Sequence, residues 1–263
     1  MEKNELLSNR MCFNGMQYRI DSEKVIAITE YVGHEINVVV PKTINGIPVT
    51  MIKYGAFREG TNIESIILHD GIEYIGDDAF KNCKSLKSIV MPSSIKSTWK
   101  QFRSTFKGCI NLEKLNIPEG VTCIGDHAFE ECSNLKSIVI PSSVEYISEY
   151  AFCDCVGLER IIIPESVKEI GKWTFKNCVS LHEVRIEGNT TKYCSTSFEN
   201  CASLERINYG ESIIKSGISF TSDNLTIRDG ILVDAKTTNE NIVIPNNVVA
   251  IGESAFENND IIY

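Results

Sequence analysis

The residues of this chain best suited to chemistry are its ten cysteines, two of which lie one residue apart. In the stretch AFCDC, Cys153 and Cys155 follow Phe152. Neighbouring thiols can bind a metal, exchange electrons or form a disulfide. No C-x-x-C pair faces a second such pair, so the spacing typical of a zinc site is missing. The structural element that positions each thiol therefore decides its role.

The other residues that could do chemistry form no recognisable constellation. The four histidines are far apart in the sequence: His34, His69, His127 and His182. No arrangement of Ser, His and Asp or of Cys and His can be assembled from them, and no glycine-rich phosphate loop is present. We therefore predict no catalytic residues, no metal site and no cofactor, and expect that the protein is not an enzyme.

A repeat runs through most of the chain, and phenylalanine marks it. Steps of 23 residues, with one of 26, connect seven positions: Phe57, Phe80, Phe106, Phe129, Phe152, Phe175 and Phe198. Three residues after the last six of them stand cysteines: Cys83, Cys109, Cys132, Cys155, Cys178 and Cys201. Leucine or isoleucine recurs six residues after each phenylalanine, and apolar residues recur nine and mostly eleven after it. This periodicity is the signature of a repeat solenoid.

One copy predicts the shape of a coil. The segment LKSIVIP alternates in period two, so it reads as a strand with Ile138 and Ile140 inward and Val139 outward. The proline ends the strand because it has no N–H for the ladder. The segment around Phe152 predicts a short helical turn. We therefore expect a β-rich repeat solenoid, with coils of about 23 residues, a parallel sheet and short helical turns.

The repeat also assigns the cysteines. The six that follow the phenylalanines take inward positions, one coil apart, where a reduced thiol packs as a small apolar group. Neighbouring coils lie within disulfide range, so disulfides within this ladder are an alternative, as is a bound metal. Both are less favoured than packed free thiols. Four cysteines lie off the ladder and are expected to be partly exposed: Cys12, Cys123, Cys153 and Cys194.

The pattern LxxIxIPxxVxxIGxxAFxxCxxL resembles the BspA-like leucine-rich repeat. The residues that carry the resemblance include Leu112, Leu115, Ile117, Pro118, Val121, Ile124, Gly125, Ala128, Phe129 and Cys132. It extends over about residues 36–208 and again over 242–263. The resemblance implies a curved, right-handed solenoid of α/β leucine-rich-repeat type and a non-catalytic role in binding proteins, often as an adhesin at the cell surface. The family shares no catalytic residues.

Breaks in the repeat suggest the domain organisation. Residues 1–35 form a lead-in with a β-hairpin cap, and residues 36–263 form the solenoid. A degenerate copy and an inserted hairpin fall at about 209–241, where Asp229-Gly230 predicts a two-residue turn between apolar strands at 225–233. The last coil stops at Tyr263, so self-association through this C-terminal end is an alternative function.

The best candidate binding site is the outward row of the strands, ten residues after each phenylalanine. It comprises Ile67, Val90, Asn116, Val139, Ile162, Arg185 and Asn208. Four of these residues are large and apolar on a face that should meet solvent, which can mark an interaction surface, although β-branched residues also simply favour strands. Trp99, in the three-residue insertion, is a second candidate as an exposed aromatic contact or as a cover for the core.

The composition of the chain limits the classes of molecule that it is expected to bind. The net charge of −9 argues against nucleic acid, and no apolar run is long enough to cross a membrane. The resemblance and the exposed outward row together predict a protein partner on a concave sheet, with a carbohydrate or cell-envelope ligand as an alternative. The location stays open: the resemblance implies the cell surface, whereas the polar N-terminal segment does not look like a signal peptide.

Overall fold

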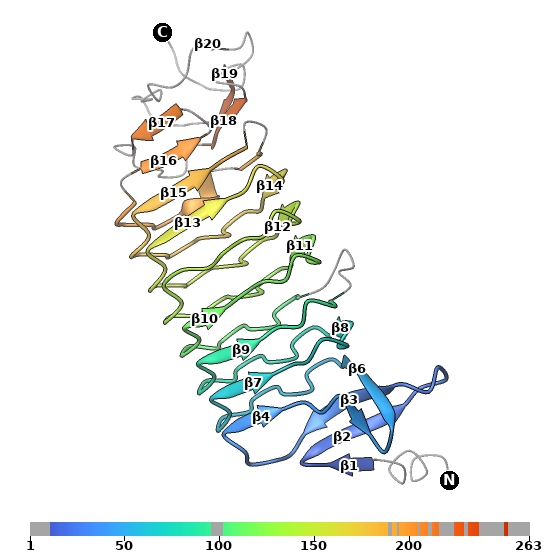
Figure 1. The fold of residues 1–263 in the computed structure, drawn as a ribbon. Helices are drawn as coiled ribbons and strands as arrows, with labels where there is room; N and C mark the ends of the chain where they lie inside the picture. Colours follow the sequence, from blue (N-terminus) through green and yellow to red (C-terminus); the bar gives the residue numbers. More distant parts are fainter. Residues whose placement is uncertain are drawn as a thin grey trace, which may run out of the picture.

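The computed structural model describes residues 11–95, 102–188, 191–193, 195–204, 206–209, 212–215, 224–228, 231–236 and 250–251. They form a β-solenoid of about seven turns with a period of about 23 residues. The coils stack along one axis, and the N-terminal strands close one end of the stack (Figure 1).

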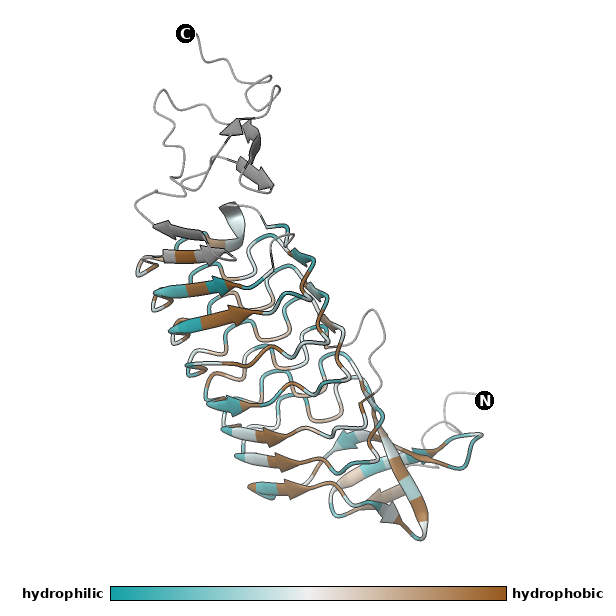
Figure 2. Cartoon of the chain, turned by 45° about the horizontal axis from the view of Figure 1, so that its top comes forward, coloured by the Kyte–Doolittle hydropathy of each residue, from teal (hydrophilic) through white to brown (hydrophobic). Residues whose placement is uncertain are grey.

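A row of parallel strands runs along one side of the solenoid. Its first sheet has the order β10-β9-β7-β4, built from β4 (Asn37–Val39), β7 (Ser65–Ile67), β9 (Ser88–Val90) and β10 (Lys114–Leu115). Its second part joins β13 (Arg160–Ile163), β15 (Glu183–Ile186) and β16 (Arg206–Tyr209), with β17 (Ser212–Lys215) antiparallel to β16. Hydrophobic residues recur at the same place in successive strands (Figure 2). The period-two prediction is therefore confirmed here.

A second, shorter row of strands forms the next corner of the coils. It consists of β11 (Cys123–Ile124), β12 (Tyr146–Ile147) and β14 (Glu169–Ile170), all parallel. In the N-terminal coils β8 (Tyr74–Ile75) pairs instead with β6 (Ile47–Ile52). The backbones of these neighbouring coils are thereby paired at a second corner as well as in the main row of strands.

The N-terminal end carries an antiparallel sheet. It is built from β1 (Met11–Phe13), β2 (Met16–Ile20) and β3 (Ile26–Tyr31), and β3 then runs parallel to β6. The short strand β5 (Thr43–Ile44) pairs with β6. Farther along the chain, β18 (Asn224–Arg228) and β19 (Ile231–Lys236) form an antiparallel hairpin, and β20 (Ala250–Ile251) runs parallel to β19.

The phenylalanines stack in one continuous column through the core. Successive rings from Phe57 to Phe198 lie 5.2–5.4 Å apart between centroids, in nearly parallel planes. Each ring is almost fully buried. Because a ring in one coil contacts the rings of the two adjacent coils, no single coil can bury its own phenylalanine, and the core forms only when the coils stack.

The inward cysteines form a second column beside the rings, and they are free thiols, as the sequence predicted. Each thiol donates a hydrogen bond to the phenylalanine carbonyl of the preceding coil; for example, Cys155 Sγ lies 3.0 Å from Phe129 O. The same bond is made by Cys83, Cys109, Cys132, Cys178 and Cys201, at 3.0–3.3 Å. The thiols therefore satisfy buried carbonyls as well as filling space.

The prediction of a short helical turn at each phenylalanine is wrong, and with it the α/β assignment. Among the described residues only Ser195–Phe198 (η2) forms a short 3-10 turn. Elsewhere the backbone is left-handed two residues before and after the ring, as at His127 (φ 57) and Glu131 (φ 65) around Phe129. The Phe129 amide then donates to Ala151 O in the next coil (2.7 Å), whereas a helix would direct every amide back along its own segment.

Candidate functional site

The outward row of the strands lies on one exposed face, as predicted. Its four large apolar side chains are 45–73% exposed: Ile67, Val90, Val139 and Ile162. Asn116 and Arg185 are exposed on the same row. Asn208 lies on β16 of this row, whereas Trp99 falls outside the described residues. We call this row the sheet face; it runs to Arg185 and begins one coil before Ile67, at Val39.

Strand register places these residues side by side. Ile67 pairs with Val90, Asn116 with Val139, and Ile162 with Arg185, all in parallel register. Neighbouring strands in such a sheet lie about 4.8 Å apart. The side chains therefore form a regular column along the stack, in which Asn116 interrupts the apolar groups once and Arg185 follows the last of them.

Sequence reasoning missed one member of the sheet face. Val39 pairs with Ile67 and is 61% exposed. It stands in the segment VVVP at 38–41, which repeats the IVIP of 138–141. The phenylalanine ladder could not reveal it, because no phenylalanine precedes Val39 at the repeat spacing. The apolar column is thus one coil longer than predicted.

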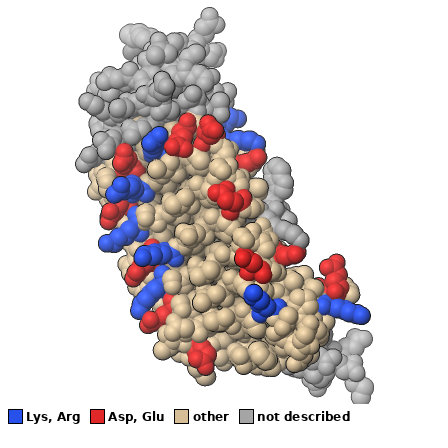
Figure 3. Space-filling view, viewed as in Figure 1, with Lys and Arg blue, Asp and Glu red and all other residues tan. Residues whose placement is uncertain are grey.

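Charged side chains gather along the edge where the strands begin and are sparse across the middle of this side (Figure 3). Just before the strands, successive coils carry Glu64, Lys87, Glu113, Lys136, Glu159 and His182. Lys87 Nζ lies 2.9 Å from Glu64 Oε2, so oppositely charged neighbours pair between coils. Both partners are about half exposed, so this ion pair contributes little stability but borders the sheet face with fixed charges.

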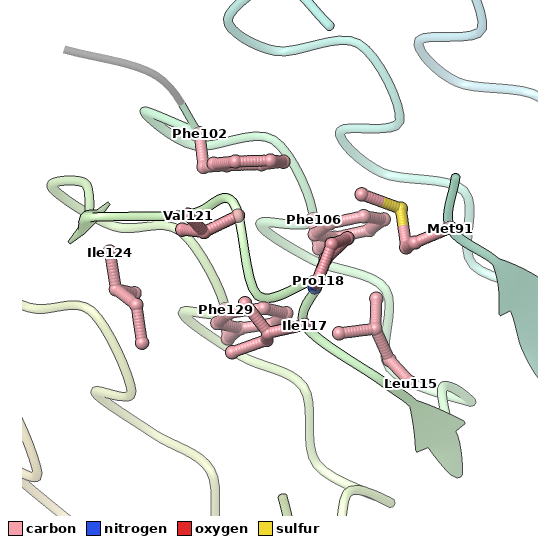
Figure 4. A pocket seen from close by; sticks show the side chains of 9 residues that line it. All are labelled: Met91, Phe102, Phe106, Leu115, Ile117, Pro118, Val121, Ile124 and Phe129. Carbon is pink, nitrogen blue, oxygen red and sulfur yellow. The ribbon is translucent and has the colours of Figure 1, made fainter. Parts of the chain in front are cut away.

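Two other hollows differ from the sheet face. Beside the insertion, a cavity of about 10 Å³ is enclosed by apolar side chains, among them Phe102, Phe106 and Phe129 (Figure 4). It has room for about one water molecule, and the described side chains that line it are all apolar. At the corner of β12 and β14, a polar groove of about 560 Å³ is lined by Tyr146, Tyr193 and several charged groups.

The structure corrects the prediction for two cysteines off the ladder. Cys123 and Cys153 are buried, with 9% and 4% of their surfaces exposed, whereas Cys12 is exposed as expected. Burial and the neighbouring Asp154 carboxylate raise the pKa of Cys153 to about 12. The neighbouring coils carry the long side chains of Glu130 and Lys176 at the corresponding position, so that Cys153 lies in a column of charged residues.

Cys153 also lies among groups that could hold a metal. Donor atoms of Glu130, Cys153 and Asp154 all lie within 4.8 Å of one another. Their lone pairs are already engaged: Glu130 Oε2 lies 2.5 Å from Lys107 Nζ and 2.7 Å from His127 Nδ1, and the Cys153 thiol donates to Asp154. Two 23-residue steps in one column bring Lys107, Glu130 and Cys153 together, which residue-type spacing alone does not show. The arrangement acts as an ion-pair network between coils.

The stacked coils, parallel strand rows and outward apolar column define a repeat solenoid of leucine-rich-repeat type. The family model of the BspA type leucine rich repeat region matches six copies over residues 50–102, 100–228 and 234–262. The chain therefore belongs to this family. Proteins with such repeats are generally non-catalytic interaction modules, which suggests the same broad role here.

Solved structures with this fold come from several bacteria. A leucine-rich repeat protein of T. pallidum is 28% identical, with a TM-score of 0.65 and coverage of 74% of this chain and 90% of that one. A leucine rich cell surface protein of Faecalibacterium prausnitzii is 22% identical (TM-score 0.53, coverage 93% and 73%). The pneumococcal vaccine antigen PcpA is 19% identical (TM-score 0.58, coverage 94% and 61%).

No curated protein matches the chain. Among the described residues, no helix has the length and apolar character needed to cross a membrane.

Proposed function

We propose that the sheet face binds a protein partner, with Val39, Ile67, Val90, Val139 and Ile162 as the apolar contacts. The observation that supports this is the column of β-branched side chains, 45–73% exposed, on strands fixed by parallel pairing. Five large apolar groups in one line are an exposed stripe of the kind that interaction surfaces use. Because the strands are held by the stack, little ordering cost accompanies binding.

A pair of double variants tests this face. Val139→Asp with Ile162→Asp places two charges on the sheet face, whereas Val156→Asp with Val179→Asp places two on another exposed part of successive coils. Bait protein is incubated with extracts of the native cell or its host, and captured proteins are quantified. Proteins retained by the wild type and by the control pair, but lost with the sheet-face pair, support the proposal. Equal capture by both pairs contradicts it, provided that circular dichroism shows both folded.

An adhesin at the cell surface is the finer form of this function. It rests on family membership and on the printed name of the Faecalibacterium protein, a leucine rich cell surface protein. Antibody labelling of intact and of permeabilised native cells separates a location at the cell surface from one inside the cell. Signal only after permeabilisation would exclude the surface role.

A carbohydrate or cell-envelope ligand is a second candidate, favoured by the polar groove at β12 and β14. Tyr146 and Tyr193 line it together with Glu149, Glu169 and Lys192. Aromatic rings with carboxylates and amines nearby suit a sugar. A glycan array probed with the wild type and Tyr146→Ala tests it: binding that Tyr146→Ala abolishes supports the groove, and an array without signal rejects it.

Self-association through the C-terminal coil is the third candidate, a structural role. Most of residues 242–263 lie outside the described residues, so the sequence pattern alone supports it. Light scattering at increasing protein concentration, with and without residues 242–263, decides it. A concentration-dependent oligomer that the deletion abolishes supports assembly.

A further inference from the structure

The parallel sheet of the strand row ends at β4. Its order is β10-β9-β7-β4, and β4 pairs with β7 alone among the strands of the described residues (Figure 1). An edge strand presents unpaired N–H and C=O groups, which are a template for another strand. The edge at β4 is therefore the place where the sheet can be extended.

The hydrogen bonds between β4 and β7 identify which backbone groups of β4 face the open edge. Ile36 O accepts from Glu64 N, and Val40 N donates to Ile67 O, so residues 36 and 40 point toward β7. In a parallel ladder successive residues point to opposite sides. Val38 therefore also faces β7, and the amide and carbonyl groups of Asn37 and Val39 face the open edge.

A preformed groove runs along this edge. Its volume is about 540 Å³, and it is lined by Asn37, Val38 and Val39 on one side and by the turns at 14–16 and 31–35 on the other. Hydrogen bonds hold the second wall: Val32 N donates to Gly15 O (2.8 Å), and Glu35 N donates to the Tyr31 hydroxyl (3.1 Å). The wall is thus fixed before any ligand arrives.

Glycine makes the close approach of the two turns possible. A Cβ on Gly15, which has a φ of +75, would lie 2.6 Å from the Cα of Gly33. A Cβ on Gly33 would lie 2.6 Å from the Tyr31 ring. Larger residues would push the turns apart and change the width of the groove.

We propose that the groove beside β4 binds an extended peptide segment of a partner protein, which adds a strand to the sheet. Main-chain hydrogen bonds to Asn37 and Val39 would hold the peptide, as in other cases of strand addition. Beside Val39, which is 61% exposed, the peptide would place a β-branched side chain and so lengthen the apolar column of the sheet face. The proposal rests on the strand edge and the groove, independently of the partner proposed for the sheet face.

A synthetic peptide with the sequence LKSIVIPS, residues 135–142, is a suitable probe because it has the pattern of a strand in this solenoid. Fluorescence anisotropy of the labelled peptide measures its binding to the full chain. We expect binding to the wild type. Val39→Ala keeps the amide but shortens the side chain beside the peptide, so it is the reference for the loss of the N–H. Val39→Pro also removes one edge N–H, and we expect its affinity to be about tenfold lower than that of Val39→Ala, the value of one good hydrogen bond.

Proline is tolerated at an edge position whose N–H faces outward, so Val39→Pro should fold, which thermal unfolding checks. A peptide N-methylated at alternate residues provides a second test on the wild type, and its loss of binding is expected. Equal binding by Val39→Ala and Val39→Pro, unchanged binding of the methylated peptide, or no binding to the wild type would overturn the proposal. Two other results would assign the edge to a segment of this chain itself and would also overturn the proposal. One is binding that appears only after residues 1–10 are removed, and the other is a dimer that Val39→Pro dissociates.

Discussion

Tyr31 stacks on Phe57, with ring centroids 5.4 Å apart and an angle of 29° between the planes. Tyr31 lies at the end of β3 in the N-terminal sheet, yet its ring continues the phenylalanine column. It precedes Phe57 by 26 residues, the same interval as the one long step of the ladder from Phe80 to Phe106. The N-terminal sheet thus covers the first coil by supplying a ring of the same kind.

Removing this ring should destabilise the whole stack. Tyr31→Ala exposes one face of Phe57 and is expected to lower the free energy of unfolding by about 2–4 kcal/mol. Tyr31→Phe keeps the ring and loses only the hydroxyl that accepts the Glu35 amide, so its cost should be about 1 kcal/mol. Urea unfolding measures both. Equal effects of the two changes would show that the ring does not act as a cap.

A second prediction concerns two buried threonines at corresponding positions before the phenylalanine. Thr105 Oγ1 is buried and has no hydrogen-bond partner within the described part of the chain, and the matching residues of four other coils are Ala56, Ala79, Ala128 and Ala151. Thr174 Oγ1, in contrast, lies 2.9 Å from Gly171 O and 3.0 Å from Ser148 O.

Thr105→Ala should therefore leave stability unchanged or raise it by up to about 1 kcal/mol, because an unsatisfied hydroxyl is removed. Thr174→Ala should lower it by about 1–2 kcal/mol, because the buried hydroxyl proton that lies between the carbonyls of Ser148 and Gly171 is lost. Thermal unfolding of the two variants under one condition makes the comparison. A cost at Thr105 equal to that at Thr174 would mean that the Thr105 hydroxyl has a partner.

The sequence predicted the core and the strands because their residue types repeat. Phenylalanine and cysteine recur at fixed steps, and period-two alternation marks the strands, so the ring column and the sheet face followed directly. The turns were predicted wrongly because left-handed backbone has no single residue type here: the position two before the ring is filled by Asp78, His127, Tyr150 and Trp173, with φ of 56–57. Hydrogen bonds to the next coil impose this conformation, and propensity within one segment does not reveal it.

The burial of a side chain by the adjacent coils could likewise not be predicted from one copy of the repeat. Cys153 has no cysteine counterpart in the neighbouring coils, which suggested an outward thiol. Its burial arises because Glu130 and Lys176, one coil to either side, have long side chains in the same column. Tyr31 and Val39 were missed for a related reason, since both precede Phe57, the first phenylalanine of the repeat, and lie outside its register.

The cysteine column predicts a loss of stability at alkaline pH. Burial raises the pKa of Cys83 and of Cys201 from 9.0 to about 12. As pH rises above 9.0, the thiols of the unfolded chain lose their protons while those of the folded chain keep them. The unfolded state then binds fewer protons, so stability falls with rising pH. The contribution is complete below pH 9.0 and is lost up to about pH 12.

Cys83→Ala isolates the effect of one thiol. Urea unfolding under reducing conditions at about pH 8 and about pH 10.5 gives the slope of stability with pH, which should be smaller in the variant by up to about 1.4 kcal/mol per pH unit. At the lower pH the variant should be less stable by about 1–3 kcal/mol, because Phe57 O loses the thiol donor at 3.0 Å. Equal slopes would mean that Cys83 titrates alike in both states.

Thiol labelling of the folded protein should now follow a different order from the one that the sequence suggested. Cys12 is exposed on the edge strand β1 and should react first. Cys153 is 4% exposed and its pKa is raised to about 12, so little reactive thiolate forms near neutral pH, and it should react as slowly as Cys155. Iodoacetamide labelling followed by peptide mapping resolves each site, and labelling in urea is the control for intrinsic reactivity. Fast modification of Cys153 in the folded protein would show that the charged column around it opens, and that its burial between Glu130 and Lys176 does not persist in solution.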